Sequence, residues 1–246
     1  MGYRKFKPSL GLSHFIDHFW MIDIQEKDLE FTHNVLPYAW FELFFNLEDS
    51  SDGEGKFVGQ LSESLAIHHQ KPYRAVGISL KPSVGNALFQ IPANRLIDQQ
   101  LYWADLDAGS NLHEQLVEAK SIEAVICLLE NYVYEKLKNY QLDEIAVFLS
   151  QRIANPSCHR IDSSLFSSIG LTRRRVEQRF VETVGVSMST YLRKSRFDAA
   201  IDCLAQGEPK VLTQVGLDLG YYDQAHFSRE FKEFAGVSPK QYQNLS

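Results

Sequence analysis

Apolar residues change their spacing part-way along the chain, and the change separates two kinds of predicted structure. From Phe15 to Leu80 the chain is rich in aromatic and β-branched residues, which favour strands. Residues 40–47 are apolar almost without interruption and predict a largely buried strand. A cluster of Asp, Ser and Gly at 49–55 then predicts a turn before a strand at 56–60. The first half of the chain is therefore expected to be mainly β.

Helical spacing replaces the strand pattern after Pro82. Apolar residues at 84–89 predict a short helix that stops before Pro92. A longer helix is expected from an N-cap at Ser121 to about Lys138, because apolar residues recur there every three or four positions. Helices are therefore expected to flank the β-rich segment before the second half of the chain begins.

A further amphipathic segment over 142–153 ends near Asn155 and Pro156, and the pattern beyond it is helical throughout. A length of 246 residues exceeds that of one ordinary domain. We therefore expect an α+β protein of two domains that divide near Asn139. A mainly β domain with flanking helices would occupy residues 1–139, and an all-α domain would occupy 140–246.

The helical half contains one unit twice. Five residues of a first segment, Phe180, Gly185-Val186-Ser187 and Tyr191, have identical counterparts 51 positions later, in Phe231, Gly236-Val237-Ser238 and Tyr242. In each copy a short helix ends at a Gly, a brief turn follows, and an N-cap residue, Thr172 or Asp223, opens the next helix. This is the helix-turn-helix pattern. Four helices are expected, a supporting and an entering one in each unit: 162–169 and 173–183 in the first, 212–219 and 224–234 in the second.

Apolar pairs four residues apart set the buried face of each entering helix, Val176 with Phe180 and Phe227 with Phe231. Arg and Gln are frequent on the opposite faces, and both have the donor and acceptor geometry that reads base edges. Residues 188–204 predict a connecting helix of roughly 26 Å. Such a helix can hold two reading helices about one DNA turn apart.

Net charge alone argues against a nucleic-acid partner, because the chain carries −6 and DNA binding requires positive charge. The distribution reverses this argument. Residues 1–140 hold 12 basic and 19 acidic residues, whereas 141–246 hold 13 and 12. Residues 173–196 hold seven basic residues and two acidic ones. The basic charge is concentrated on the repeated unit and the connecting helix.

The second unit also closely resembles a known signature. Residues 220–232, together with Gly236-Val237-Ser238-Pro239 and Tyr242, resemble the AraC family of bacterial transcription regulators. The resemblance extends from about Leu142 to Tyr242. It implies seven helices, two helix-turn-helix units joined by a central helix, and sequence-specific binding of double-stranded DNA. Phe166 and Gly216 depart from the family, which usually has Ala at both positions.

Matched residue by residue, the resemblance places the base contacts on the early and middle turns of the two entering helices. Together with the neighbouring arginines, the expected DNA-binding residues are Arg173, Arg174, Arg175, Glu177, Gln178, Arg179, Gln224, Ala225, His226 and Arg229. The entering helices would occupy successive segments of the major groove.

The first half resembles, more weakly, the β-rich domain that precedes this module in one subgroup, through Pro37, Glu42-Leu43, Val58-Gly59 and residues 76–82. The resemblance implies a domain that binds a small-molecule effector or forms a homodimer. RNA polymerase is a further partner that a regulator of this family implies. No residue pattern selects among these partners.

Two alternatives remain beside the transcription regulator. In one, the β domain only dimerises. In the other it is a metal-dependent enzyme that uses His14, His18, His33 or His68. His14 and His18 have ligand spacing only if they lie on a helix, and the adjacent His68 and His69 would face opposite sides of a strand.

Other features of the sequence favour neither catalysis nor export. Cys158-His159 would need an orienting carboxylate to act as a nucleophile pair, and none is indicated. The three cysteines are expected to be free thiols, and no signal peptide or membrane segment is expected. We therefore expect a cytoplasmic protein that needs no metal or cofactor and is not an enzyme.

Overall fold

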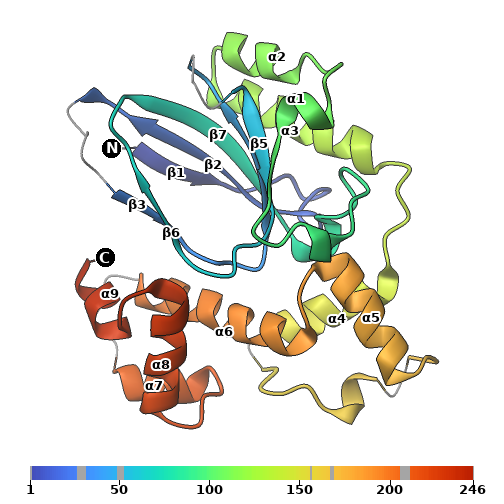
Figure 1. The fold of residues 1–246 in the computed structure, drawn as a ribbon, viewed down its shortest axis with the longest axis vertical. Helices are drawn as coiled ribbons and strands as arrows, with labels where there is room; N and C mark the ends of the chain where they lie inside the picture. The colour runs from blue at the N-terminus through green and yellow to red at the C-terminus, as the bar shows by residue number, and fades with distance from the viewer. Residues whose placement is uncertain are drawn as a thin grey trace.

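The first half of the chain forms a curved antiparallel sheet. The computed structural model describes residues 2–26, 32–48, 53–155, 157–166, 169–205 and 211–245. In spatial order, the six strands of the main sheet are β1 (Gly2–Phe6), β2 (Ile16–Ile24), β7 (Tyr73–Leu80), β4 (Phe41–Asn46), β5 (Gly55–Val58) and β8 (Gln100–Tyr102). A two-stranded ribbon of β3 (Thr32–Val35) and β6 (Leu65–His68) extends toward the helical half (Figure 1). The expected mainly β character of residues 15–80 is confirmed.

One face of the sheet carries the core of this half. Phe41, Phe45 and Ile78 are fully buried there and pack with Leu129 and Val133 of a covering helix. The covering elements are η2 (Pro82–Val84), η3 (Ala93–Arg95), α1 (Trp103–Leu106), α2 (Leu112–Glu118) and α3 (Ile122–Leu137). Ser121 caps α3 as expected, because its hydroxyl accepts from the amide of Ala124. The helix expected at 84–89 is instead the single 3-10 turn η2, followed by further turns.

The second half is all helical. In chain order it contains α4 (Glu144–Ala154), η4 (Ser163–Leu165), α5 (Arg173–Val184), α6 (Met188–Leu204), α7 (Leu212–Asp218), α8 (Gln224–Ala235) and α9 (Pro239–Leu245). Within the described residues, the seven expected helical positions are thus six α-helices and one 3-10 turn. In Figure 1, α6 runs below the sheet, with α4 and α5 toward one end and α7, α8 and α9 at the other.

The supporting helix expected at 162–169 is the main departure from the predicted pattern. Among its described residues only η4 is helical. Phe166 follows in a turn and packs, partly buried, against the core of the first unit. The centre of its ring lies 5.4 Å from the guanidinium carbon of Arg173. Residues 167 and 168 lie outside the described residues. The bulky Phe166, where the family has Ala, therefore coincides with a first supporting element of different form.

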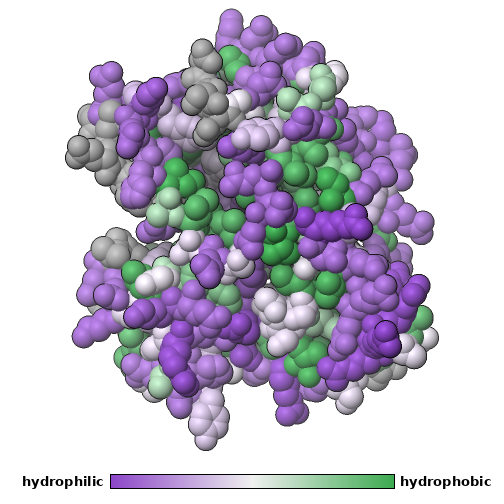
Figure 2. Space-filling view, in the orientation of Figure 1, coloured by the Kyte–Doolittle hydropathy of each residue, from purple (hydrophilic) through white to green (hydrophobic). Residues whose placement is uncertain are grey.

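Two residues of the first half are buried in the hydrophobic clusters of the second half. Leu36 is buried in the cluster formed by α6, α7 and α8, and Ala39 is buried in the cluster formed by α4, α5 and α6. Figure 2 shows hydrophobic side chains gathered near the middle of the molecule, where the two halves meet. The division near Asn139, between α3 and α4, stays a prediction. None of the described helices combines the length and apolar character needed to cross a membrane.

Candidate nucleic-acid interface

The two entering helices, α5 and α8, begin and end in the same way. The hydroxyl of Thr172 accepts from the amide of Arg175, and the carboxylate of Asp223 accepts from the amide of His226 at 2.7 Å. Each helix ends at a glycine with positive φ, 98° at Gly185 and 75° at Gly236. A residue with a Cβ would be strained at either end, so the repeated Gly is required by the backbone.

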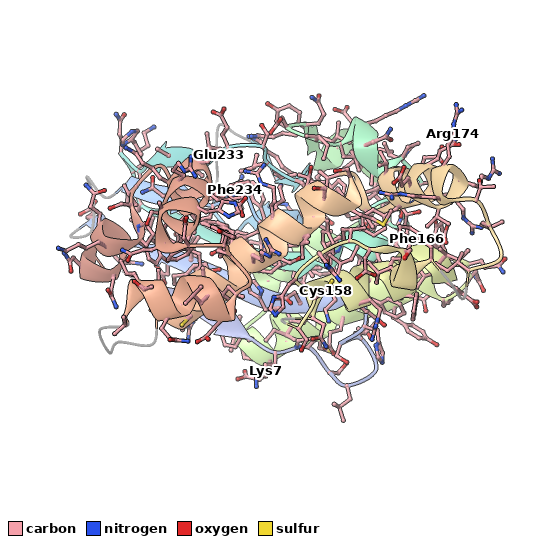
Figure 3. The ribbon with its side chains drawn as sticks, turned by 90° about the horizontal axis from the view of Figure 1, so that it is seen from below. Lys7, Cys158, Phe166, Arg174, Glu233 and Phe234 are labelled. Atoms are coloured by element: carbon pink, nitrogen blue, oxygen red, sulfur yellow. The ribbon has the colours of Figure 1, made fainter. Side chains whose placement is uncertain are left out.

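Each entering helix buries the apolar pair predicted from its spacing. Val176 and Phe180 are fully buried beneath α5, and Phe227 and Phe231 are buried beneath α8. The opposite faces are open to solvent. The candidate residues that are exposed are Arg173, Arg174, Arg175, Gln178, Gln224, Ala225 and Arg229, whereas Glu177, Arg179 and His226 are half-buried. Figure 3 shows Arg174 projecting from α5 at the edge of the molecule.

Several of the exposed groups are held by weak surface contacts. Arg173 donates to Glu177 at 2.8 Å, and Gln178 donates to Glu182 at 2.9 Å, both across one helical turn. The side chains of Arg173 and Glu177 are 65% and 46% exposed, so this ion pair adds little stability. Such pairs orient the side chains yet can be exchanged for contacts with a charged partner.

Arg179 has a stronger contact than its neighbours. Its Nε donates to Asp143 at 2.7 Å, and Asp143 also caps α4 by accepting from the amides of Ile145 and Ala146. The residue 51 positions later, Glu230, accepts from Nε of Arg193 on α6 at 2.7 Å. Each entering helix is therefore tied to an earlier helix by an ion pair, α5 to the N-cap of α4 and α8 to α6, and the charges are reversed between the two units.

Arg193 is one of the basic residues of the connecting helix α6, and its contacts are internal. Its guanidinium donates to Glu230 and Glu233 and lies 5.1 Å from the ring centre of Phe234. Both carboxylates hold the pKa of Arg193 well above its usual range, although burial alone would lower it. These partners lie 37 and 40 residues away, so the repeat pattern contains no signal for them.

A groove lies between the two units and has a volume of about 1000 Å³. Its lining includes Gln178 and Glu182 of α5, Arg193 and Arg196 of α6, and His226 and Glu230 of α8. The ring of His226 also packs edge-on against Tyr221, with 5.3 Å between the ring centres. Both entering helices therefore border the same groove.

A half-buried carboxylate in the first half was not expected from the sequence. Glu42 of β4 accepts hydrogen bonds from Nε1 of Trp20 and from the hydroxyl of Ser79, both at 2.7 Å. Burial raises the pKa of Glu42 to about 7, although the two hydrogen bonds oppose the shift. The signal available in the sequence was one acidic residue within a largely apolar strand.

The histidines proposed for a metal-dependent enzyme are dispersed in the structure. His14 lies in a turn and His18 in β2, where His18 contacts Asp17 and Ser79. His68 is exposed on β6, and the side chain of His33 lies outside the described residues. Over the part of the chain that the structure describes, no three His, Cys, Asp or Glu side chains are grouped to hold a metal ion.

Cys158 and His159 do not form a paired nucleophile and base. The thiol of Cys158 donates to the main-chain oxygen of Arg160, whereas the ring of His159 packs against Gly220. Cys158 lies half-buried in the loop that precedes η4 (Figure 3). The three cysteines are free thiols, as the sequence predicted.

Comparison with known proteins agrees with this geometry. Residues 165–245, from η4 to α9, match the model of a helix-turn-helix domain. The C-terminal part of this chain is an AraC-type helix-turn-helix domain. Residues 4–102, which contain the whole main sheet except two terminal residues of β1, match a domain of unknown function, DUF6597.

Curated relatives of this chain are named as uncharacterized helix-turn-helix transcriptional regulators. One from Staphylococcus aureus is 26% identical over 140 residues, which is 53% of this chain and 18% of the relative. One from Haemophilus influenzae is 36% identical over 63 residues, which is 26% of this chain and 21% of the relative. The chain thus spans about a fifth of the length of these relatives.

A solved structure has the same overall fold. ToxT from Vibrio cholerae aligns over 92% of this chain and 97% of its own, with a TM-score of 0.54 and 14% identity. At this identity the likeness concerns the fold alone. It extends the similarity from the AraC-type domain to the arrangement of a β domain followed by helices.

Proposed function

We propose that this protein is a transcription regulator that binds a specific sequence of double-stranded DNA. The observation that carries the proposal is the pair of entering helices, α5 and α8, which share caps and buried faces and border one groove. Helix-turn-helix proteins read the major groove with such a helix. Because α6 joins the two units, the helices would occupy successive segments of the groove on one side of the duplex.

The side chains divide by the contact that each would make. Arg174 and Gln178 on α5, and Gln224 on α8, are exposed and have base-reading geometry. Arg173 and Arg175 lie near the start of α5, where a cation and free amides both favour phosphate. Glu177, Ala225, His226 and Arg229 complete the proposed contact set. Arg179 belongs to it only if its ion pair with Asp143 opens.

The first half would modulate DNA binding. ToxT has been solved with an unsaturated fatty acid bound, which supports a small-molecule effector for this chain as well. The burial of Leu36 and Ala39 in the hydrophobic clusters of the second half provides the physical connection through which an effector would act. A second copy of the chain and RNA polymerase are the proposed protein partners. The proposal includes no catalytic step, and it places the protein in the cytoplasm with the DNA.

Selection of bound sites from random duplexes tests the proposal. We expect an enriched two-part site with centres about 10 bp apart. Affinity should fall steeply with salt, because phosphate contacts release counterions. The control is a duplex of the same length with the selected bases scrambled. Equal affinity for the selected and scrambled duplexes would show that the protein does not read sequence.

A further inference from the structure

The two helix-turn-helix units touch each other at a second place besides α6. His159 lies in the loop that precedes η4, and Gly220 lies in the turn between α7 and α8. A Cβ at Gly220 would lie 2.2 Å from Nδ1 of His159, closer than any real contact. Gly220 also has a φ of 78°, which a residue with a Cβ rarely adopts. Only glycine therefore allows this close approach of the two units.

Arg196 joins the two sides of this contact. It lies at the centre of α6, and its guanidinium donates to the main-chain oxygen of His159 on the side of the first unit. The same guanidinium lies 5.5 Å from the ring centre of Tyr221, which is buried in the second unit. The four residues His159, Arg196, Gly220 and Tyr221 are called the inter-unit clamp below.

The chemistry of arginine suits this position better than that of lysine. A guanidinium is planar, so it can stack on an aromatic ring while its edge donates hydrogen bonds. A lysine ammonium keeps the charge but lacks the planar face. The clamp therefore depends on the shape of Arg196 as well as on its charge, which separates it from a simple phosphate contact.

We infer that Arg196 is a positioning residue that holds α5 and α8 at one separation and thereby selects the spacing between the two halves of the DNA site. The inference rests on the proposed function. The competing role is a direct phosphate contact, because Arg196 also lines the groove between the units. The two roles predict different effects of substitution on spacing and on salt dependence.

Binding to sites of different spacing separates these roles. The probes are duplexes in which the two selected half-sites have centres about 9 to 12 bp apart. With Arg196→Gln we expect the preference for the best spacing over the next longer one to fall by about fivefold. The slope of log affinity against log salt should stay unchanged. An unchanged spacing preference with a slope reduced by about 1 would overturn the inference in favour of a phosphate contact.

Two further variants act as controls. Arg196→Lys keeps the charge. If Arg196 contacts a phosphate, this variant should recover the affinity that Arg196→Gln loses. If Arg196 forms the clamp, it should lose the preference for one spacing as Arg196→Gln does. Arg175→Gln removes an exposed arginine at the start of α5. This variant should reduce the slope of log affinity against log salt and leave the spacing preference unchanged. Circular dichroism of each variant checks that the helical content is retained.

A measurement without DNA keeps the inference separate from the proposed function. Spin labels are placed at Gln178→Cys and Arg229→Cys, both exposed, in full-length protein whose Cys127, Cys158 and Cys203 are changed to Ser. The distance distribution between the labels should be narrow with Arg196 and clearly broader with Arg196→Gln. Equal distributions would overturn the clamp. Absence of sequence-specific binding by the unsubstituted protein would overturn the proposed function and leave this distance measurement to decide the clamp.

Discussion

Lys194 of α6 donates through its Nζ to the main-chain oxygen of Leu61, at 2.7 Å, in the loop between β5 and β6. The same ammonium donates to the main-chain oxygen of Tyr38 at 3.2 Å, and the side chain is only 3% exposed. Nearby, Nε2 of Gln60 donates to the main-chain oxygen of Val184 at the end of α5, at 2.6 Å. The β domain thus contacts both the connecting helix and the first entering helix through buried polar groups.

The buried ammonium makes stability depend on alkaline pH. Burial lowers the pKa of Lys194 to about 8, although Asp198 and Asp98 oppose the shift. Between pH 8 and about 10.4 the unfolded chain binds more protons than the folded one, so stability rises with pH over this window. We expect Lys194→Met to remove this rise. Urea unfolding at several pH values between 7.5 and 10, compared between the two proteins, measures the difference. If the free energies of unfolding of the two proteins change with pH in parallel, the pKa of Lys194 is not lowered in the folded protein.

The raised pKa of Glu42 should make the stability of the fold change with pH in the opposite direction, and at lower pH. Its pKa in the folded protein is raised from 4.5 to about 7. Between these values the folded chain binds more protons than the unfolded one, so stability falls as pH rises through the window. Glu42→Gln should flatten this fall, because the amide keeps partners for Trp20 and Ser79 but carries no charge. Thermal unfolding between pH 5 and 8 is the measurement, with the exposed Glu48→Gln as control.

Arg174 is the clearest test of base reading. It is exposed on α5 and projects away from the body of the protein (Figure 3), so its removal should not disturb the fold. We expect Arg174→Ala to cost on the order of 1–3 kcal/mol in binding to the selected site and to relax preference at one base position. Competition between the selected duplex and single-base variants measures both effects. Equal losses on all sequences would assign Arg174 to phosphate instead.

Arg193 should matter for stability before it matters for DNA. Glu230 is buried, so Arg193→Met leaves its carboxylate without its charged partner. We expect the free energy of unfolding to fall by about 2 kcal/mol, less than for a fully buried pair because Arg193 is partly exposed. The double variant Arg193→Met with Glu230→Met should recover part of this loss. Urea unfolding of the two single variants and the double variant measures the coupling, and strict additivity would exclude it.

The sequence by itself determined those features that depend on neighbours a few residues away. The N-caps at Ser121, Thr172 and Asp223 all form, because a capping side chain reaches an amide only three positions ahead. The bounds of α6 match the prediction of 188–204, since its helical spacing and caps are equally local. The repeat identified both entering helices, and apolar pairs four residues apart identified their buried faces, because such a pair lies about one helical turn apart.

Tertiary structure alone decided the features that depend on partners far along the chain. Arg179 and Arg193 belong to the same basic stretch as Arg174, yet both face carboxylates more than 30 residues away. Among its described residues the first supporting element is a 3-10 turn rather than an α-helix, and nothing in its local spacing marks the difference. The contact of His159 with Gly220 and the anchoring of Lys194 in the β domain likewise arise only when separate segments pack. Spacing along the chain encodes which face of a helix is apolar, whereas the partner of a charged group is set by how the helices pack in space.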